Sequence, residues 1–191
     1  MTNLKNIKSY LRKNKINACL ISKDNQYLNE FTSPSENLLL KISGFTGSLG
    51  YALIYQKDQY LYVDGRYHQQ AKIQSRKFTV KDISELKKDL GLFLNIKNNL
   101  LIDPRTFSYN FFEKYKYKNL VFFNSLKKKN YNNYISNLTK NYCGEETPEK
   151  IKKISSKIKL KKNEAFFITS PENIGWLSNI RVLKKKYNKN L

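Results

Sequence analysis

The side chain with the clearest chemical potential in this sequence is Arg66, in the turn Asp64-Gly65-Arg66-Tyr67. Asp64 occupies a position typical of a helix N-cap, where its carboxylate accepts the backbone N–H of Arg66 or Tyr67. We therefore expect Arg66 in the first turn of a helix. A guanidinium group is a planar fork of donors that suits carbonyl or carboxylate groups. The alternative is a structural arginine that pairs with Asp64 or with a nearby carbonyl oxygen.

The other polar residues give no support to hydrolytic chemistry. A two-metal hydrolase needs a cluster of oxygen ligands and imidazole around an activated water. The chain has a single histidine, His68, and no acidic cluster near it in sequence, so we expect His68 on a surface or a helix face. Ser48 and Cys19 lack the His and Asp partners that nucleophilic catalysis requires. The sequence therefore predicts no catalytic residue and no metal ligand in this chain.

Three glycines, Gly44, Gly47 and Gly50, divide a loop that leads into an apolar run. A phosphate-binding loop ends in Gly-Lys-Ser/Thr and opens onto a helix, and this loop does neither. We expect the glycines to serve the backbone conformation of the loop. Phe45, between them, is expected to close the end of the core.

Alternating strands and helices must position the turn and the glycine loop. Residues 51–55 and 60–63 are apolar and aromatic runs joined by a polar turn, which predicts an antiparallel hairpin. Other short apolar runs predict strands, and apolar residues at helical spacing predict helices. The expected strands are 18–22, 77–81, 99–103 and 119–124, and the expected helices are 4–15, 66–74, 84–95 and 106–115. This order predicts an α/β domain over residues 1–125, with a mixed open sheet and helices on both faces.

The second half of the chain reads as a connector and the start of another domain. Residues 126–146 are polar and rich in Asn and Lys, which is typical of an exposed connector. Thr147 caps a helix that begins with proline, and a strand is expected over 164–169. Because this order repeats that of the first domain, we expect an incomplete second copy over 147–181. A solvated basic tail is expected over 182–191.

Three motifs in this order resemble the N-terminal part of aminopeptidase P, the Xaa-Pro aminopeptidases of the creatinase and prolidase group. They are Ser43-Gly-Phe-Thr-Gly-Ser48, Asp64-Gly-Arg-Tyr67 and Trp176-Leu-Ser-Asn-Ile-Arg181. The resemblance covers roughly residues 4–181, and it departs from the family signature at Val182, where a glycine belongs. It implies a creatinase/prolidase N-terminal domain followed by a related second copy, with hydrolysis assigned to a separate C-terminal metal domain.

The resemblance also implies a function. The family removes the residue before a proline at position two of a peptide, using two divalent metal ions, with manganese expected, in the catalytic domain. In aminopeptidase P the arginine of this motif lies by the catalytic cleft and contacts the bound peptide, and the resemblance implies the same role for Arg66. The chain is thus expected to be the non-catalytic N-terminal region of a truncated Xaa-Pro aminopeptidase. It would help peptide binding and assembly and hold no cofactor of its own. This expectation is compatible with a homodimer.

Two other functions remain as alternatives. The first is a stand-alone binding or assembly subunit for a separately encoded peptidase. The second is nucleic-acid binding, because the formal net charge is +21 and a basic surface binds phosphates. The lysines are spread along the chain, however, and no nucleic-acid module is recognisable, so a specific nucleic-acid partner is not expected.

The composition favours an ordinary cytoplasmic protein. No apolar run reaches the roughly 18 residues of a membrane span, and the N-terminus lacks the apolar core of a signal peptide. No membrane partner is therefore expected. The chain has 191 residues with eleven Phe and fourteen Tyr, enough for a hydrophobic core. Cys19 and Cys143 show neither a disulfide framework nor a metal-ligand spacing, so we expect free thiols.

Overall fold

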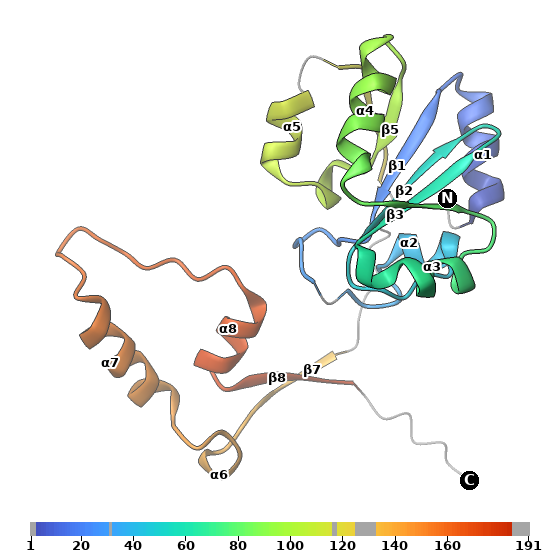
Figure 1. Cartoon of the computed structure of the whole chain (residues 1–191). Helices are drawn as coiled ribbons and strands as arrows, with labels where there is room; N and C mark the ends of the chain where they lie inside the picture. The colour runs from blue at the N-terminus through green and yellow to red at the C-terminus, as the bar shows by residue number, and fades with distance from the viewer. Residues whose placement is uncertain (1–2, 31, 116–117, 125–132, 185–191) are drawn as a thin grey trace, which may run out of the picture. The chain divides into compact units, whose positions relative to one another are not determined.

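The computed structural model describes residues 3–30, 32–115, 118–124 and 133–184 (Figure 1). The chain divides into two compact units, residues 1–127 and 128–191, and each is described by itself. None of the helices in the described ranges is long and apolar enough to cross a membrane.

Unit 1, residues 1–127, is built on a six-stranded sheet. Its strands are β1 (Ala18–Ser22), β2 (Gly50–Tyr55), β3 (Gln59–Val63), β4 (Thr79–Asp82), β5 (Leu100–Ile102) and β6 (Leu120–Phe122). Their order across the sheet is β4-β3-β2-β1-β5-β6. Only β2 runs antiparallel to its neighbours, and every other pair of neighbours is parallel. The carboxyl ends of β1, β3, β4, β5 and β6 therefore meet at one edge of the sheet.

Helices cover both faces of this sheet (Figure 1). They are α1 (Leu4–Lys13), α2 (Leu38–Ser43), α3 (His68–Gln74), α4 (Glu85–Asn95) and α5 (Tyr109–Tyr115), with 3-10 turns η1 (Gly65–Tyr67) and η2 (Pro104–Thr106). Successive strand residues point to opposite faces, so Cys19 and Ile21 join the core beneath α1, α2 and α3. Leu20 joins the core beneath α4 and α5. The predicted mixed sheet with two covered faces is confirmed.

Two elements of unit 1 differ from the sequence prediction. Helix α2 precedes the glycine loop and was not predicted. It begins after Asn37, whose Oδ1 accepts the N–H of Leu40 at 2.9 Å, and ends at Gly44, whose φ is +78°. The helix expected to begin at Thr106 starts only at Tyr109 because the backbone at Phe107 is extended (φ −130°) after the turn η2.

Unit 2, residues 128–191, contains one two-stranded sheet and three helices in its described part. The strands are β7 (Asn133–Asn137) and β8 (Ile180–Lys184), and the helices are α6 (Lys140–Cys143), α7 (Thr147–Ile158) and α8 (Pro171–Leu177). Helix α7 begins with a capping box, in which the side chains of Glu146 and Glu149 each accept a backbone N–H of the first turn.

Four expectations for this half need correction. Thr147, expected as the cap of α7, is the first residue of that helix, and Glu146 is the cap. The described part of 126–146, expected as a connector, contains β7 and α6, because β7 pairs with the distant strand β8. Strand β8 continues to Lys184, beyond the expected start of the tail at 182. The strand expected over 164–169 is not formed, because these residues pair with no strand of the described residues.

The two cysteines, both free thiols, provide a chemical test of this fold. Cys19 in β1 is 0% exposed, and burial raises the pKa of its thiol, whereas Cys143 is partly exposed. We expect a thiol reagent such as 5,5′-dithiobis(2-nitrobenzoate) to label only Cys143 in the native protein and both residues in denaturant. A Cys143→Ser variant should therefore give no rapid reaction. Rapid native labelling of that variant would show that β1 is not in the core.

Candidate functional site

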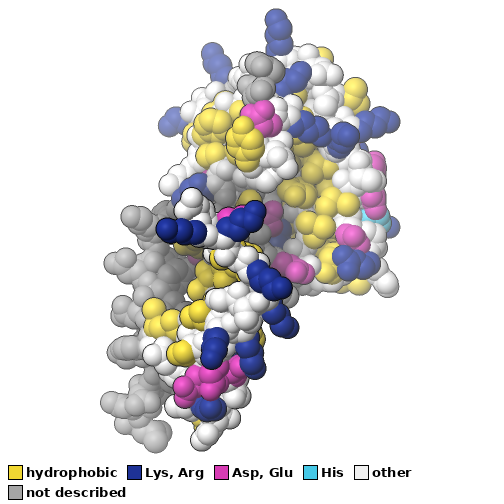
Figure 2. All heavy atoms as spheres, turned by 90° about the vertical axis from the view of Figure 1, so that its left-hand side faces the viewer, with side chains coloured by type: hydrophobic (Ala, Val, Ile, Leu, Met, Phe, Trp, Pro, Cys, Tyr) yellow, Lys and Arg dark blue, Asp and Glu magenta, His cyan; other side chains and the backbone are white. Residues whose placement is uncertain are grey.

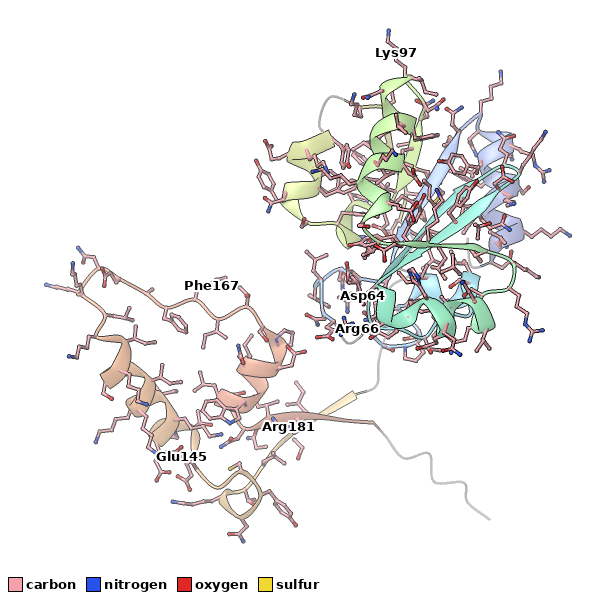
Figure 3. The ribbon with its side chains drawn as sticks, viewed as in Figure 1. Asp64, Arg66, Lys97, Glu145, Phe167 and Arg181 are labelled. Carbon is pink, nitrogen blue, oxygen red and sulfur yellow. The ribbon has the colours of Figure 1, made fainter. Side chains whose placement is uncertain are left out.

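Polar residues gather at the carboxyl edge of the sheet in unit 1. Lys23 and Asp24 follow β1, Asp64 follows β3, and Asp103 follows β5. Figure 3 shows Asp64 and Arg66 together at this end of unit 1, with Lys97 at the opposite end. Ligands of open α/β sheets bind outside the carboxyl ends of the strands. This edge is therefore the candidate site.

The turn after β3 holds the side chain of Arg66 through its Nε. One oxygen of Asp64, Oδ1, accepts the backbone N–H of Arg66 at 3.0 Å and its side-chain Nε at 2.8 Å. These bonds lower the pKa of the Asp64 carboxyl and raise the pKa of Arg66. The predicted N-cap is confirmed, although the turn is a 3-10 turn before α3 begins at His68. Arg66 also makes the bond to Asp64 that the structural alternative expected.

A second Asp-x-Arg turn, after β5, shows what distinguishes Arg66. Both carboxylate oxygens of Asp103 accept bonds from Arg105: Nε donates to Oδ1 at 3.1 Å and Nη2 to Oδ2 at 2.8 Å. Nη2 also donates to Asn124, and the Arg105 side chain is 33% exposed. Arg66 is 75% exposed, and its terminal amino groups donate to no other described residue. The guanidinium of Arg105 is thus engaged within the fold. Arg66 has an open fork, in the sense that its two terminal amino groups have no partner among the described residues.

The glycine loop forms the support beside this turn. Phe45 is fully buried and meets the ring of Tyr67 edge-on, with centroids 5.7 Å apart, so its predicted role in the core is confirmed. The hydroxyls of Ser48 and Tyr67 lie 2.9 Å apart. A side chain at Gly47 would collide with the Phe45 ring. The guanidinium carbon of Arg66 lies 5.6 Å from the centroid of the Tyr67 ring, which completes a connected surface.

Lys23 is a residue of this edge that the sequence did not reveal. It is only 5% exposed, and its backbone N–H donates to Gly50 O at 3.0 Å. Burial lowers the pKa of its amine, against the opposing effect of Asp24 and Glu30. A lysine directly after a short, mainly apolar strand was the available signal.

His68 lies beside a single acidic side chain. Its Nε2 lies 3.5 Å from Oδ2 of Asp82, on a partly exposed surface of α3. Among the residues that the structure describes, no group of three His, Cys, Asp or Glu side chains could hold a metal ion.

In unit 2 the signature around Trp176 is a structural junction. Lys150 of α7 is 3% exposed, and its ammonium donates to Trp176 O at 2.8 Å and lies 4.4 Å from the centroid of the Trp176 ring. Asn179, with φ of +56°, accepts from the same ammonium and donates to Glu145 O at 3.0 Å. Arg181 donates to Gly175 O at 2.8 Å. These bonds join α7, α8 and β8.

The fold and this edge define a known class of domain. Two family models described as the creatinase/prolidase N-terminal domain match the chain, one over residues 3–128 and the other over 126–188. The first covers more than half of the 191 residues. The chain therefore belongs to the creatinase/prolidase N-terminal domain family, as the sequence motifs predicted.

Particular relatives are aminopeptidases. The probable Xaa-Pro aminopeptidase P of Coprinopsis cinerea is 26% identical over 203 residues, which cover 95% of this chain and 33% of that protein. The corresponding protein of Laccaria bicolor is 27% identical over 209 residues, 97% of this chain and 32% of its own length. The chain thus spans about a third of the length of the curated relatives it matches.

One solved structure supports the fold. The crystal structure of X-prolyl aminopeptidase from Caenorhabditis elegans, described as a cytosolic enzyme with a di-nuclear active site, matches with a TM-score of 0.65. The match covers 87% of this chain and 31% of that chain at 21% identity. At this level of identity the likeness concerns the arrangement of the backbone.

Proposed function

We propose that this chain is the non-catalytic N-terminal region of an Xaa-Pro aminopeptidase, in which it helps to bind the peptide and to assemble with a catalytic domain. That domain would hold two divalent metal ions, with manganese expected, and cleave before a proline at position two. Arg66 would contact the peptide. The open fork of Arg66 is the observation that carries this proposal.

The electrostatics of the turn support the proposed role. Asp64 fixes Nε and leaves the two terminal amino groups of Arg66 directed to solvent, in a geometry that suits a peptide carbonyl or carboxylate. Tyr67 and the glycine loop restrict the side chain from one side. A donor that is already oriented loses less conformational entropy when the peptide binds.

A stand-alone assembly subunit would use the same residues toward a separately encoded catalytic chain. An observation in unit 2 supports this alternative. Phe167 and Trp176 are 86% and 52% exposed, and large exposed apolar side chains favour contact with another polypeptide. Both versions assign no peptide hydrolysis to the chain alone.

The test is a chimera in which this chain replaces the matching third of the Coprinopsis cinerea relative. With Mn²⁺ and an Xaa-Pro-Xaa peptide, we expect the chimera to release the first residue and the isolated chain to release none above a blank. Arg66→Ala should lower kcat/KM of the chimera about 10- to 100-fold, the usual effect of removing a charged hydrogen bond.

Arg76→Ala is the matched control, because Arg76 is an exposed arginine of unit 1 that makes no hydrogen bond or ion pair through its side chain with another described residue. It should leave kcat/KM within about twofold of the parent. Equal, small effects of the two substitutions would make Arg66 a structural residue only. Metal-dependent hydrolysis by the isolated chain would contradict the non-catalytic assignment, and a folded but inactive chimera would contradict the role in assembly.

A further inference from the structure

A cavity of about 610 Å³ lies in unit 1 on the face of the sheet covered by α4 and α5. Its floor is Leu20 of β1 and Leu90 of α4, which are 1% and 2% exposed. Figure 2 shows hydrophobic side chains gathered on this side of the unit, with Lys and Arg side chains around them. The volume falls within the range of roughly 300–1,000 Å³ that small-molecule sites occupy.

One wall of the cavity is a series of aromatic rings. Tyr51 and Phe107 are stacked, with centroids 6.5 Å apart and an interplanar angle of 26°. Phe107 and Phe111 follow at 4.5 Å and 35°. Phe107 is held by the extended backbone between η2 and α5, and Phe111 by the first turn of α5. Such a wall offers flat apolar surface to a planar or aliphatic group.

The charged groups that line the cavity are unequal in number. Lys87 of α4 and Lys114 of α5 are both exposed and therefore lie at its solvent side. Lys114 lies 5.0 Å from the Tyr115 ring, and neither lysine has an acidic partner among the described residues. The one acidic group, Asp24, accepts a hydrogen bond from Ser22 at 2.8 Å in the loop after β1. The two helices thus leave a net positive charge beside an aromatic wall.

We propose that this cavity binds a small amphipathic carboxylate. Its apolar or aromatic body would lie against Tyr51, Phe107 and Phe111, and its anionic group would meet Lys87 and Lys114. The two lysines favour an anionic ligand over other ligands of the same shape. An amine would gain nothing from the lysines, and a neutral ligand would contact only the aromatic wall. The cavity and Arg66 are separate features, so this site does not depend on the proposed peptidase role.

The experiment titrates the full chain with 4-phenylbutyrate and follows backbone amide signals by NMR. We expect saturable shifts confined to the segments that line the cavity: the end of β1 with the loop after it, the start of β2, residue 83 with α4, and residues 106–108 with α5. The neutral 4-phenylbutan-1-ol and the cationic 4-phenylbutylamine have the same body and should bind at least about fivefold more weakly, because they lose the contacts with two lysines.

The double variant Lys87→Ala/Lys114→Ala should weaken binding of 4-phenylbutyrate by about the same factor, since it leaves the aromatic wall intact. Lys88→Ala is the matched control on α4, because Lys88 is exposed but does not line the cavity. Equal binding of the three ligands, or an equal effect of Lys88→Ala, would overturn the assignment of the anion. Shifts elsewhere in the chain, or none at millimolar ligand, would overturn the site.

Discussion

Replacing Gly47 by alanine is expected to destabilise unit 1 by about 3 kcal/mol or more, because overpacking next to a rigid core ring is costly. A Cβ at this position would lie 2.8 and 2.9 Å from two carbons of the Phe45 ring. Phe45 is 0% exposed and packs in the core beneath α1, α2 and α3. The ring has to leave its place or the loop has to move, and either change opens the contact with Tyr67.

Gly91→Ala is the matched control, since a Cβ at Gly91 would meet no heavy atom within 4 Å. It lies inside α4, where alanine should stabilise the protein by about 0.5–1 kcal/mol. The measurement is the loss of the native amide signals of β1 and β3 during urea titration. A Gly47→Ala variant within about 0.5 kcal/mol of the parent would show that Phe45 is not fixed against the glycine loop.

Local signals were sufficient for most of unit 1. The apolar run Ala18–Ser22 is a strand with the predicted bounds, and the hairpin of β2 and β3 begins one residue before each predicted start. Helix α2 was not predicted because its six residues are too few to show a helical period. Its signals were the caps, Asn37 before it and Gly44 after it.

Local sequence signals were not sufficient to predict unit 2, because its strands depend on distant partners. Strand β7 is polar and is defined by pairing with β8, more than forty residues later in the chain. The run at 164–169 has the composition of a strand, but a strand requires a neighbour to receive its backbone hydrogen bonds. Local propensity alone therefore predicted an element where no pairing exists and overlooked one where pairing exists.

The candidate site was predictable where one turn determines it. Asp64 and Arg66 are two residues apart, so the N-cap rule alone placed them together. Arg105 could have been found by the same rule, since Asp103-Pro104-Arg105 also follows a strand. The contrast between a closed and an open fork was not predictable, because it depends on Asn124, which follows a different strand, β6.

The second large effect that we expect is a difference in the rate of amide hydrogen exchange between the two units. Among residues 135–181 of unit 2 no hydrophobic side chain is buried; the buried side chains there are Lys150 and Asn179. The sheet formed by the described residues of unit 2 has two strands, and an isolated two-stranded sheet is marginally stable in water. The buried bonds of Lys150 join the helices to β8, but polar contacts add little net stability without apolar burial.

We therefore expect amides of β1, β2 and β3 to exchange at least about a thousandfold more slowly than those of α8 and β8, since exchange follows the free energy of local opening. Native-state exchange measured by NMR or by peptide mass spectrometry checks this, with amides of the exposed turn at residues 56–58 as an internal fast reference. Equal protection across 164–184 and 51–63 would mean that unit 2 is stabilised by contacts other than its own core. Slow exchange in unit 2 only when a catalytic domain is added would instead place the missing apolar contacts in that partner.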